Sequence, residues 1–177
     1  MPQHLVVTFT GPDRPGIVDA LADLVQRHGA NWERSRMATL AGRFAGVLEV
    51  TADPERAAAL AGALEGVEDL TVRVDRGSSG PAPDSLLRLE LTGQDRPGIV
   101  HEVTRILAAR AVSIHELETE TVETPVGGGM LFRATAELSA PANVSRETLQ
   151  AALEEIAHDL MVEIELTEPP SPQAQPA

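Results

Sequence analysis

The feature that most constrains this chain is a nine-residue segment that occurs twice. Residues 10–18 read Thr-Gly-Pro-Asp-Arg-Pro-Gly-Ile-Val and residues 92–100 read Thr-Gly-Gln-Asp-Arg-Pro-Gly-Ile-Val, so eight of nine positions agree at an offset of 82. A second correspondence, which matches Phe44 with Phe132, has an offset of 88 and therefore places six extra residues in the second copy. Repetition of this kind indicates one folding unit present in two copies.

Composition indicates a linker between the two repeated units and a tail after the second one. Residues 77–84 are rich in Gly, Ser and Pro, which is typical of a flexible linker. Residues 168–177 form a Pro-rich tail that has little to bury, and we expect it to be disordered. The sequence therefore predicts a first domain over residues 3–76 and a second domain over residues 85–167.

Both units show the same order of periodic segments. Helices with apolar residues at helical spacing are expected after residues 16 and 53 and again after residues 98 and 145. Strands are expected over residues 5–9, 32–40, 44–51 and 70–74, and over residues 86–91, 113–122, 131–138 and 162–166. This order predicts an α+β fold of two ferredoxin-like βαββαβ units, each a four-stranded antiparallel sheet with two helices on one face.

The repeated segment joins the first strand of each unit to its first helix. A helix begins with unpartnered backbone N–H groups and a partial positive charge, so its start attracts anions. Pro15 is tolerated in a first turn, Gly16 leaves the amides accessible, and Asp13 can cap them or lie near a bound ammonium group. Such a cluster suits a zwitterionic ligand, whose carboxylate would bind the amides and whose ammonium group would lie near the aspartate. The alternative is a purely structural turn, because any strand-to-helix turn benefits from Pro, Gly and a capping Asp.

The same reasoning applies to the second loop, where Arg96, like Arg14, could screen the aspartate or reach a partner chain. The candidate ligand-binding residues of the loops are Asp13, Arg14, Pro15, Gly16 and Ile17, together with Asp95, Arg96, Pro97, Gly98 and Ile99.

Composition excludes several classes of function. The 177 residues carry a formal charge of −13 and include no cysteine, so disulfides, thiolate metal sites and cysteine nucleophiles are excluded. An acidic chain with 2% aromatic residues is not expected to bind nucleic acid directly. No apolar run approaches the roughly 18 residues of a membrane span, and residues 1–9 lack the basic segment of a secretory signal. We therefore expect a cytoplasmic protein without membrane contact.

Catalysis and metal binding find no support in the sequence. The five histidines are scattered, no two of them have helical metal-ligand spacing, and no nucleophile elbow is present. We therefore assign no catalytic residue, no metal site and no cofactor.

The strand, the Asp-Arg-Pro-Gly-Ile-Val loop, the amphipathic helix and the following Gly-Ala-Asn-Trp at residues 29–32 resemble an ACT domain, an amino-acid-binding regulatory module. Two such domains in one chain are similar to the group of glycine-cleavage-system transcriptional repressors. The resemblance implies ligand contacts from backbone near Asp13–Ile17 and from the side chain of Asn31. In the second unit Ser113 replaces this Asn and Ala111 replaces Gly29, so an equivalent second site is in question.

The resemblance implies a non-enzymatic sensor of a small amino acid such as glycine at an interface between ACT domains. It would act through a protein partner, either a regulator or a metabolic enzyme, and affect transcription indirectly. A homodimer is expected, because small units with exposed sheet edges gain by pairing. Two alternatives stay open: a detached regulatory subunit of an amino-acid-biosynthetic enzyme, and an acylphosphatase-like hydrolase that would use Arg14 and Asn31.

Charge also differs between the two units. Residues 1–76 carry a net charge of −3 and residues 77–177 carry −10, so the second unit could attract a basic partner. On the second strands, Arg34 and Arg36 of the first unit correspond to Glu116 and Glu118 of the second. We hypothesise that these strands pair through the opposite charges; the alternative is a solvated polar face.

Overall fold

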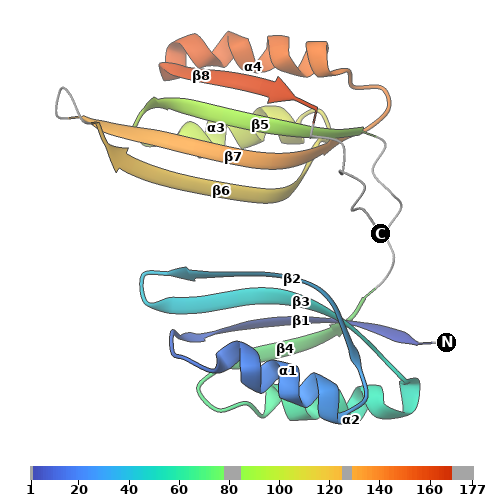
Figure 1. Ribbon diagram of the computed structural model, residues 1–177. Coiled ribbons are helices and arrows are strands. Elements are labelled where there is room, and N and C mark those ends of the chain that lie inside the picture. Colours follow the sequence, from blue (N-terminus) through green and yellow to red (C-terminus); the bar gives the residue numbers. More distant parts are fainter. Residues whose placement is uncertain (1, 78–84, 125–128, 169–177) are drawn as a thin grey trace, which may run out of the picture. The chain divides into compact units, whose positions relative to one another are not determined.

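The computed structural model describes residues 2–77, 85–124 and 129–168 (Figure 1). The chain divides into two compact units, Met1–Gly80 and Pro81–Ala177. Residues 78–84 of the expected linker and residues 169–177 of the expected disordered tail lie outside the described part of the chain.

The first domain consists of β1 (Gln3–Pro12), α1 (Ile17–Arg27), β2 (Asn31–Leu40), β3 (Arg43–Ala52), α2 (Pro54–Glu65) and β4 (Thr71–Arg76). Its four strands form one sheet in the order β2-β3-β1-β4, in which every neighbouring pair is antiparallel. Both helices cover the same face of this sheet (Figure 1). Strand β2 is therefore an edge strand.

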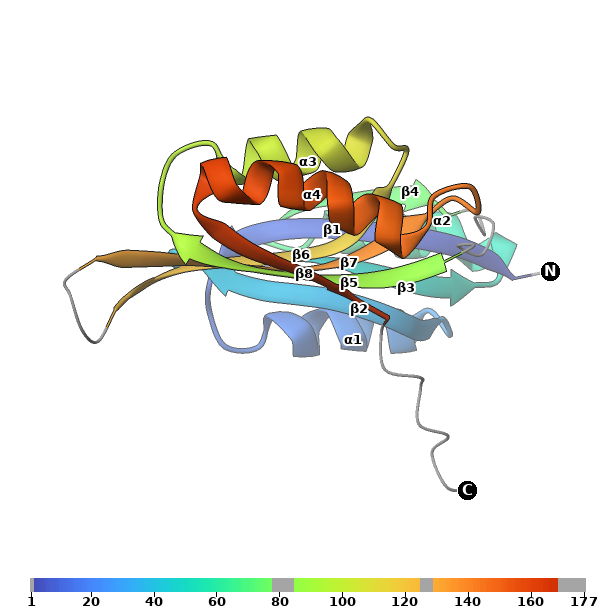
Figure 2. The same cartoon turned by 90° about the horizontal axis from the view of Figure 1, so that it is seen from above.

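The second domain repeats this plan with β5 (Ser85–Gln94), α3 (Ile99–Ala108), β6 (Ser113–Glu123), β7 (Met130–Ala140), α4 (Arg146–Leu160) and β8 (Val162–Thr167). The sheet order is β6-β7-β5-β8, again antiparallel throughout. Helices α3 and α4 lie side by side over one face (Figure 2). The predicted fold of two ferredoxin-like βαββαβ units is thus confirmed.

Each domain has its own core between sheet and helices, as the period-two and helical patterns predict. In the first, Leu5 and Val7 of β1 meet Leu21 of α1, and all three side chains are at most 3% exposed. In the second, Leu89 of β5 and Leu107 of α3 are buried in the corresponding way. Burial of these residues determines which face of each sheet the helices cover. It therefore also determines where the loops between strands and helices leave the sheet.

Strand register places the two ends of α1 at opposite ends of the first sheet. At one end Pro12 pairs with Arg43, which also pairs with Leu40 of β2. At the other end Asn31, the first residue of β2, pairs with Thr51. The nine steps along β2 between these ends span about 30 Å. The loop before α1 and the start of β2 are therefore far apart within one domain.

The first glycine of each repeated segment is required by close packing of backbone. A Cβ on Gly11 would lie 2.5 Å from the carbonyl oxygen of Asp69, and one on Gly93 would lie 2.5 Å from that of Met161. Asp69 and Met161 themselves have positive φ values of 65° and 50° and occupy the connections into β4 and β8. This glycine therefore recurs because the last strand of each domain enters against it.

We predict that Gly11→Ala destabilises the first domain by about 1–3 kcal/mol, because the added methyl overpacks against backbone that cannot move aside. The matched control is Gly62→Ala on α2, where a Cβ meets nothing within 4 Å. That change should stabilise the same domain by about 0.5–1 kcal/mol. Urea unfolding followed by fluorescence of the single tryptophan, Trp32, measures both. Equal stability of the two variants would contradict this account of Gly11.

Candidate functional site

In both repeated loops, a glycine in the left-handed conformation directly precedes the helix. Gly16 precedes α1 with φ 88°, and Gly98 precedes α3 with φ 98°. These values favour glycine strongly, because a side chain is strained there. A Cβ on either glycine would meet nothing within 4 Å, so the space around each of these residues is open.

The first amides of α1 and α3 have no protein acceptor among the described residues. The hydrogen bonds of α1 begin with the N–H of Ala20, which donates to Gly16 O at 2.9 Å. In α3 the corresponding bond is from Glu102 N–H to Gly98 O at 3.0 Å. In the described part of the chain no side chain caps either helix. The vacant N–H groups are those of Ile17, Val18 and Asp19 in α1 and of Ile99, Val100 and His101 in α3.

The helices outside the repeated segment begin differently. Helix α2 starts at Pro54, which has no N–H, and the N–H of Arg56 donates to Asp53 O at 2.9 Å. Helix α4 is capped by Ser145, whose Oγ accepts from Thr148 N–H at 3.2 Å. Among the described residues, three consecutive vacant amides thus distinguish the starts of α1 and α3 from those of α2 and α4, which leave fewer N–H groups without an acceptor.

The proposed capping role of the loop aspartates is wrong. Asp13 and Asp95 lie three residues before the left-handed glycine, which itself occupies the cap position. Their backbone N–H groups hold the loops instead: Asp13 donates to Gly42 O at 3.0 Å, and Asp95 donates to Met130 O at 2.9 Å. Both carboxylates are exposed and leave the helix amides uncovered.

The other loop residues are arranged around these vacant amides. Ile17 and Ile99 are 2% exposed, so the first residue of each helix is anchored in the core. Arg14 reaches sideways, and its Nη2 donates to the carbonyl of Glu68 at 3.4 Å. The remaining candidates Pro15, Gly16, Pro97 and Gly98 are exposed, and Arg96 is half-buried.

Asn31, by contrast, does not lie near the loop of its own domain. It is exposed at the start of β2, at the opposite end of the sheet from Asp13–Ile17. One ligand can therefore touch both groups only if two different ACT-like domains contribute them. This separation also counts against a hydrolase site built from Arg14 and Asn31 within one domain.

Two residues beside Asn31, Glu33 and Thr51, contact each other and are not predicted by the sequence pattern. Glu33 Oε1 accepts hydrogen bonds from Asn31 Nδ2 at 3.0 Å and from Thr51 Oγ1 at 2.7 Å. These two bonds lower the pKa of the Glu33 carboxyl. The alternation of side chains between the two faces of β2 does not predict this contact, because a register irregularity between Trp32 and Arg34 displaces Glu33.

A second ionic cluster lies next to it on the same sheet. Glu49 on β3 accepts from Arg34 Nε at 2.9 Å and from Arg34 Nη2 at 2.7 Å, and its other oxygen lies 3.1 Å from His4 Nδ1. The Arg34 and His4 hydrogen bonds lower the pKa of Glu49. The charge of Arg34 is therefore already balanced by Glu49 within its own sheet. The position of the Arg34 side chain requires no pairing with Glu116.

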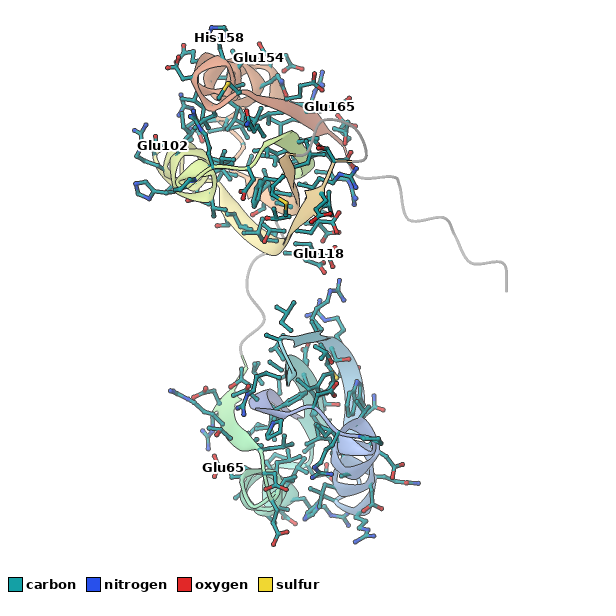
Figure 3. All side chains as sticks on the ribbon, turned by 90° about the vertical axis from the view of Figure 1, so that its left-hand side faces the viewer. Glu65, Glu102, Glu118, Glu154, His158 and Glu165 are labelled. Carbon is teal, nitrogen blue, oxygen red and sulfur yellow. The ribbon has the colours of Figure 1, made fainter. Side chains whose placement is uncertain are left out.

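The second domain has different chemistry at the equivalent positions. Ser113 starts β6 and pairs with Ser139, and the register irregularity recurs between Ile114 and Glu116. In Figure 3, Glu118 and Glu165 project from the face of the sheet opposite α3 and α4. The acidic excess of this half of the chain is thus partly carried by the sheet face opposite its two helices.

An apolar cavity of about 20 Å³ lies in the second domain between α3 and the sheet. Ile99 and Val100 of the helix start line it, as does Ile114 of β6. At the position of Ile114 the first domain has Trp32, which packs against its core. The cavity is large enough for about one water molecule and is apolar, so it offers no room for an amino acid.

Comparison with known proteins identifies the class of this chain. A family model described as "ACT domain" matches residues 3–75, and another of the same description matches residues 87–156. The chain belongs to the ACT-domain family and consists of two ACT domains in tandem.

Similar proteins place it within that family. The glycine cleavage system transcriptional repressor of Escherichia coli strain K12 is 26% identical over 164 residues, which cover 89% of this chain and 85% of the repressor. A crystal structure of an unknown protein from Galdieria sulphuraria is 33% identical, covers 96% of this chain and all of its own, and superposes with a TM-score of 0.84. The chain is an ACT-domain regulatory protein related to this repressor.

Among the described residues no helix is both long and apolar enough to cross a membrane. Within the same residues, His, Asp and Glu side chains form no group of three that could hold a metal ion.

The lowered pKa values predict that the first domain loses stability in acid. Glu33 and Glu49 bind fewer protons when folded than when unfolded, so their contribution is complete above the unfolded pKa of about 4.3. It is lost as pH falls through their lower folded values. Chemical unfolding of the full chain at pH 6, 4 and 3, read by Trp32 fluorescence, measures this loss.

Glu49→Gln is the variant that tests the assignment. It should be less stable than the unaltered chain at pH 6, and this difference should shrink toward pH 3. Glu68→Gln, which removes an exposed carboxylate between α2 and β4 and outside the cluster, is the matched control. A stability difference for Glu49→Gln that stays constant over this range would contradict the assignment.

Proposed function

We propose that this protein senses a small amino acid, which binds with its carboxylate on the vacant amides that open α1, at an interface between ACT domains. The observation that carries the proposal is the set of three N–H groups at Ile17, Val18 and Asp19 without an acceptor among the described residues. A carboxylate would accept from these groups and gain from the positive end of the helix. ACT domains typically bind small amino acids, which supports the same ligand class.

The separation of Asn31 from its own loop supports a site shared by two ACT domains. Strand β2 is an edge of the first sheet and pairs within that sheet with β3 alone, so we propose that a second copy of the chain pairs with its outer side. Antiparallel pairing of two β2 edges would bring the start of one strand beside the end of the other. Asn31 of one copy would then lie near the loop of its partner, and the ligand would stabilise the homodimer.

A ligand site shared by two ACT domains allows ligand binding to act as a signal. An amino acid that contacts two domains binds the paired state more tightly than the separate state, and only this difference in affinity can shift the equilibrium. We propose that a protein partner responds to the paired state. Since the related repressor is a transcriptional regulator, the partner we favour is itself a regulator, and the effect on transcription is indirect.

We predict that at least one amino acid, with glycine and serine the first choices, raises the melting temperature of the full chain. At a concentration one hundred times its dissociation constant, a ligand stabilises by roughly 2.7 kcal/mol. A thermal-shift panel of all twenty amino acids at millimolar concentrations measures this. No shift from any of them would overturn the proposed function.

Two substitutions at the helix starts then locate the site. Val18→Asp places a carboxylate beside the α1 amides, which stabilises the helix by about 0.3–1 kcal/mol and repels an anionic ligand. We expect affinity to fall at least tenfold, whereas Val18→Asn, of similar shape without the charge, should lose much less. Val100→Asp makes the same change at α3 and should leave binding at the first domain intact. Retained binding by Val18→Asp would place the carboxylate elsewhere.

A further inference from the structure

Strand β2 contains a local irregularity beside the residue expected to contact the ligand. Trp32 pairs with Val50 and Arg34 pairs with Glu49, so Glu33 is an extra residue in β2 with no partner of its own on β3. Such bulges redirect a side chain and are frequent next to binding sites. Here the redirected carboxylate lies against the side chains of Asn31 and Thr51.

This contact fixes which way the Asn31 amide points. An ionised carboxylate can only accept hydrogen bonds, so the Nδ2 group of Asn31 must face Glu33. The observed distance from Asn31 Nδ2 to Glu33 Oε1 is 3.0 Å, and Thr51 Oγ1 donates to the same oxygen at 2.7 Å. The other end of the amide, Oδ1, is then left as an acceptor on the exposed side of β2.

We propose that Glu33 is a positioning residue for the amino acid ligand: its carboxylate holds the amide of Asn31 so that Oδ1 accepts a hydrogen bond from the ligand's ammonium group. This inference rests on the proposed function, since it assigns the second half of the zwitterion to the start of β2. The negative charge of Glu33, one side chain away, favours the same cationic group.

The second domain lacks this arrangement. Its bulge places His115 where the first domain has Glu33, and Ser113 and Ser139 occupy the positions of Asn31 and Thr51. Among the described residues no hydrogen bond joins these three side chains. The ammonium group is therefore recognised by the first domain.

Binding of matched ligands to the full chain tests the assignment. The probes are glycine and serine, each compared with the acid that lacks its α-amino group, acetate and 3-hydroxypropanoate. We expect Glu33→Gln to weaken the binding of the amino acid about tenfold and to leave the affinity of the deaminated acid unchanged, because only the amino acid uses Asn31 Oδ1. Thr51→Val, which removes the second donor to Glu33, should have a smaller effect in the same direction.

The control variant is His115→Gln at the equivalent bulge, which should leave the affinities for both classes of ligand unchanged. Thermal unfolding followed by circular dichroism, which reports on both domains, checks that each variant is folded. If the unaltered chain binds an amino acid and Glu33→Gln binds it equally well, the positioning role is overturned while the proposed function stands. An equal loss for amino acid and acid also overturns it. If no amino acid binds the unaltered chain, the proposed function itself fails.

Discussion

The structure of each domain depends on one backbone constraint: the chain enters its first helix through a glycine in the left-handed conformation. At Gly16 and Gly98 the cap position has no side chain that could accept a hydrogen bond from the helix. The amides that follow are consequently left without a partner among the described residues, although Ile17 and Ile99 anchor the same helix starts in the core. A turn that is fully explained by backbone conformation thus also leaves a set of donors for an anion.

The sequence predicted the fold well because its repeats and periodicities are local signals. The paired order of strands and helices followed from alternation in segments such as 131–138 and from helical spacing in segments such as 99–107. The site was predicted less well. Asp13 was expected to cap a helix, but its role depends on a contact with Gly42 in the β2–β3 turn, which no local pattern reveals. Glu33 was missed because a bulge interrupts the alternation that would otherwise place it.

The two domains share a backbone but differ in the chemistry at the start of the second strand. In the first domain Asn31, Glu33 and Thr51 form a hydrogen-bonded group, and Glu49 with its neighbours Arg34 and His4 lies beside it. In the second, the corresponding strand begins at Ser113, and acidic side chains project from the sheet face opposite the helices. The two domains are therefore not chemically equivalent at this position, although their backbones follow the same plan.

The amides of Ile17, Val18 and Asp19 can be observed one by one in a ¹⁵N–¹H correlation spectrum of the labelled full chain. Titration with the amino acid that stabilises the protein should move these three resonances together. Their shifts should saturate with the dissociation constant found by thermal stabilisation, because a carboxylate is accepting hydrogen bonds from them. If the ligand binds and these three resonances stay in place while others move, the helix start is not the carboxylate site.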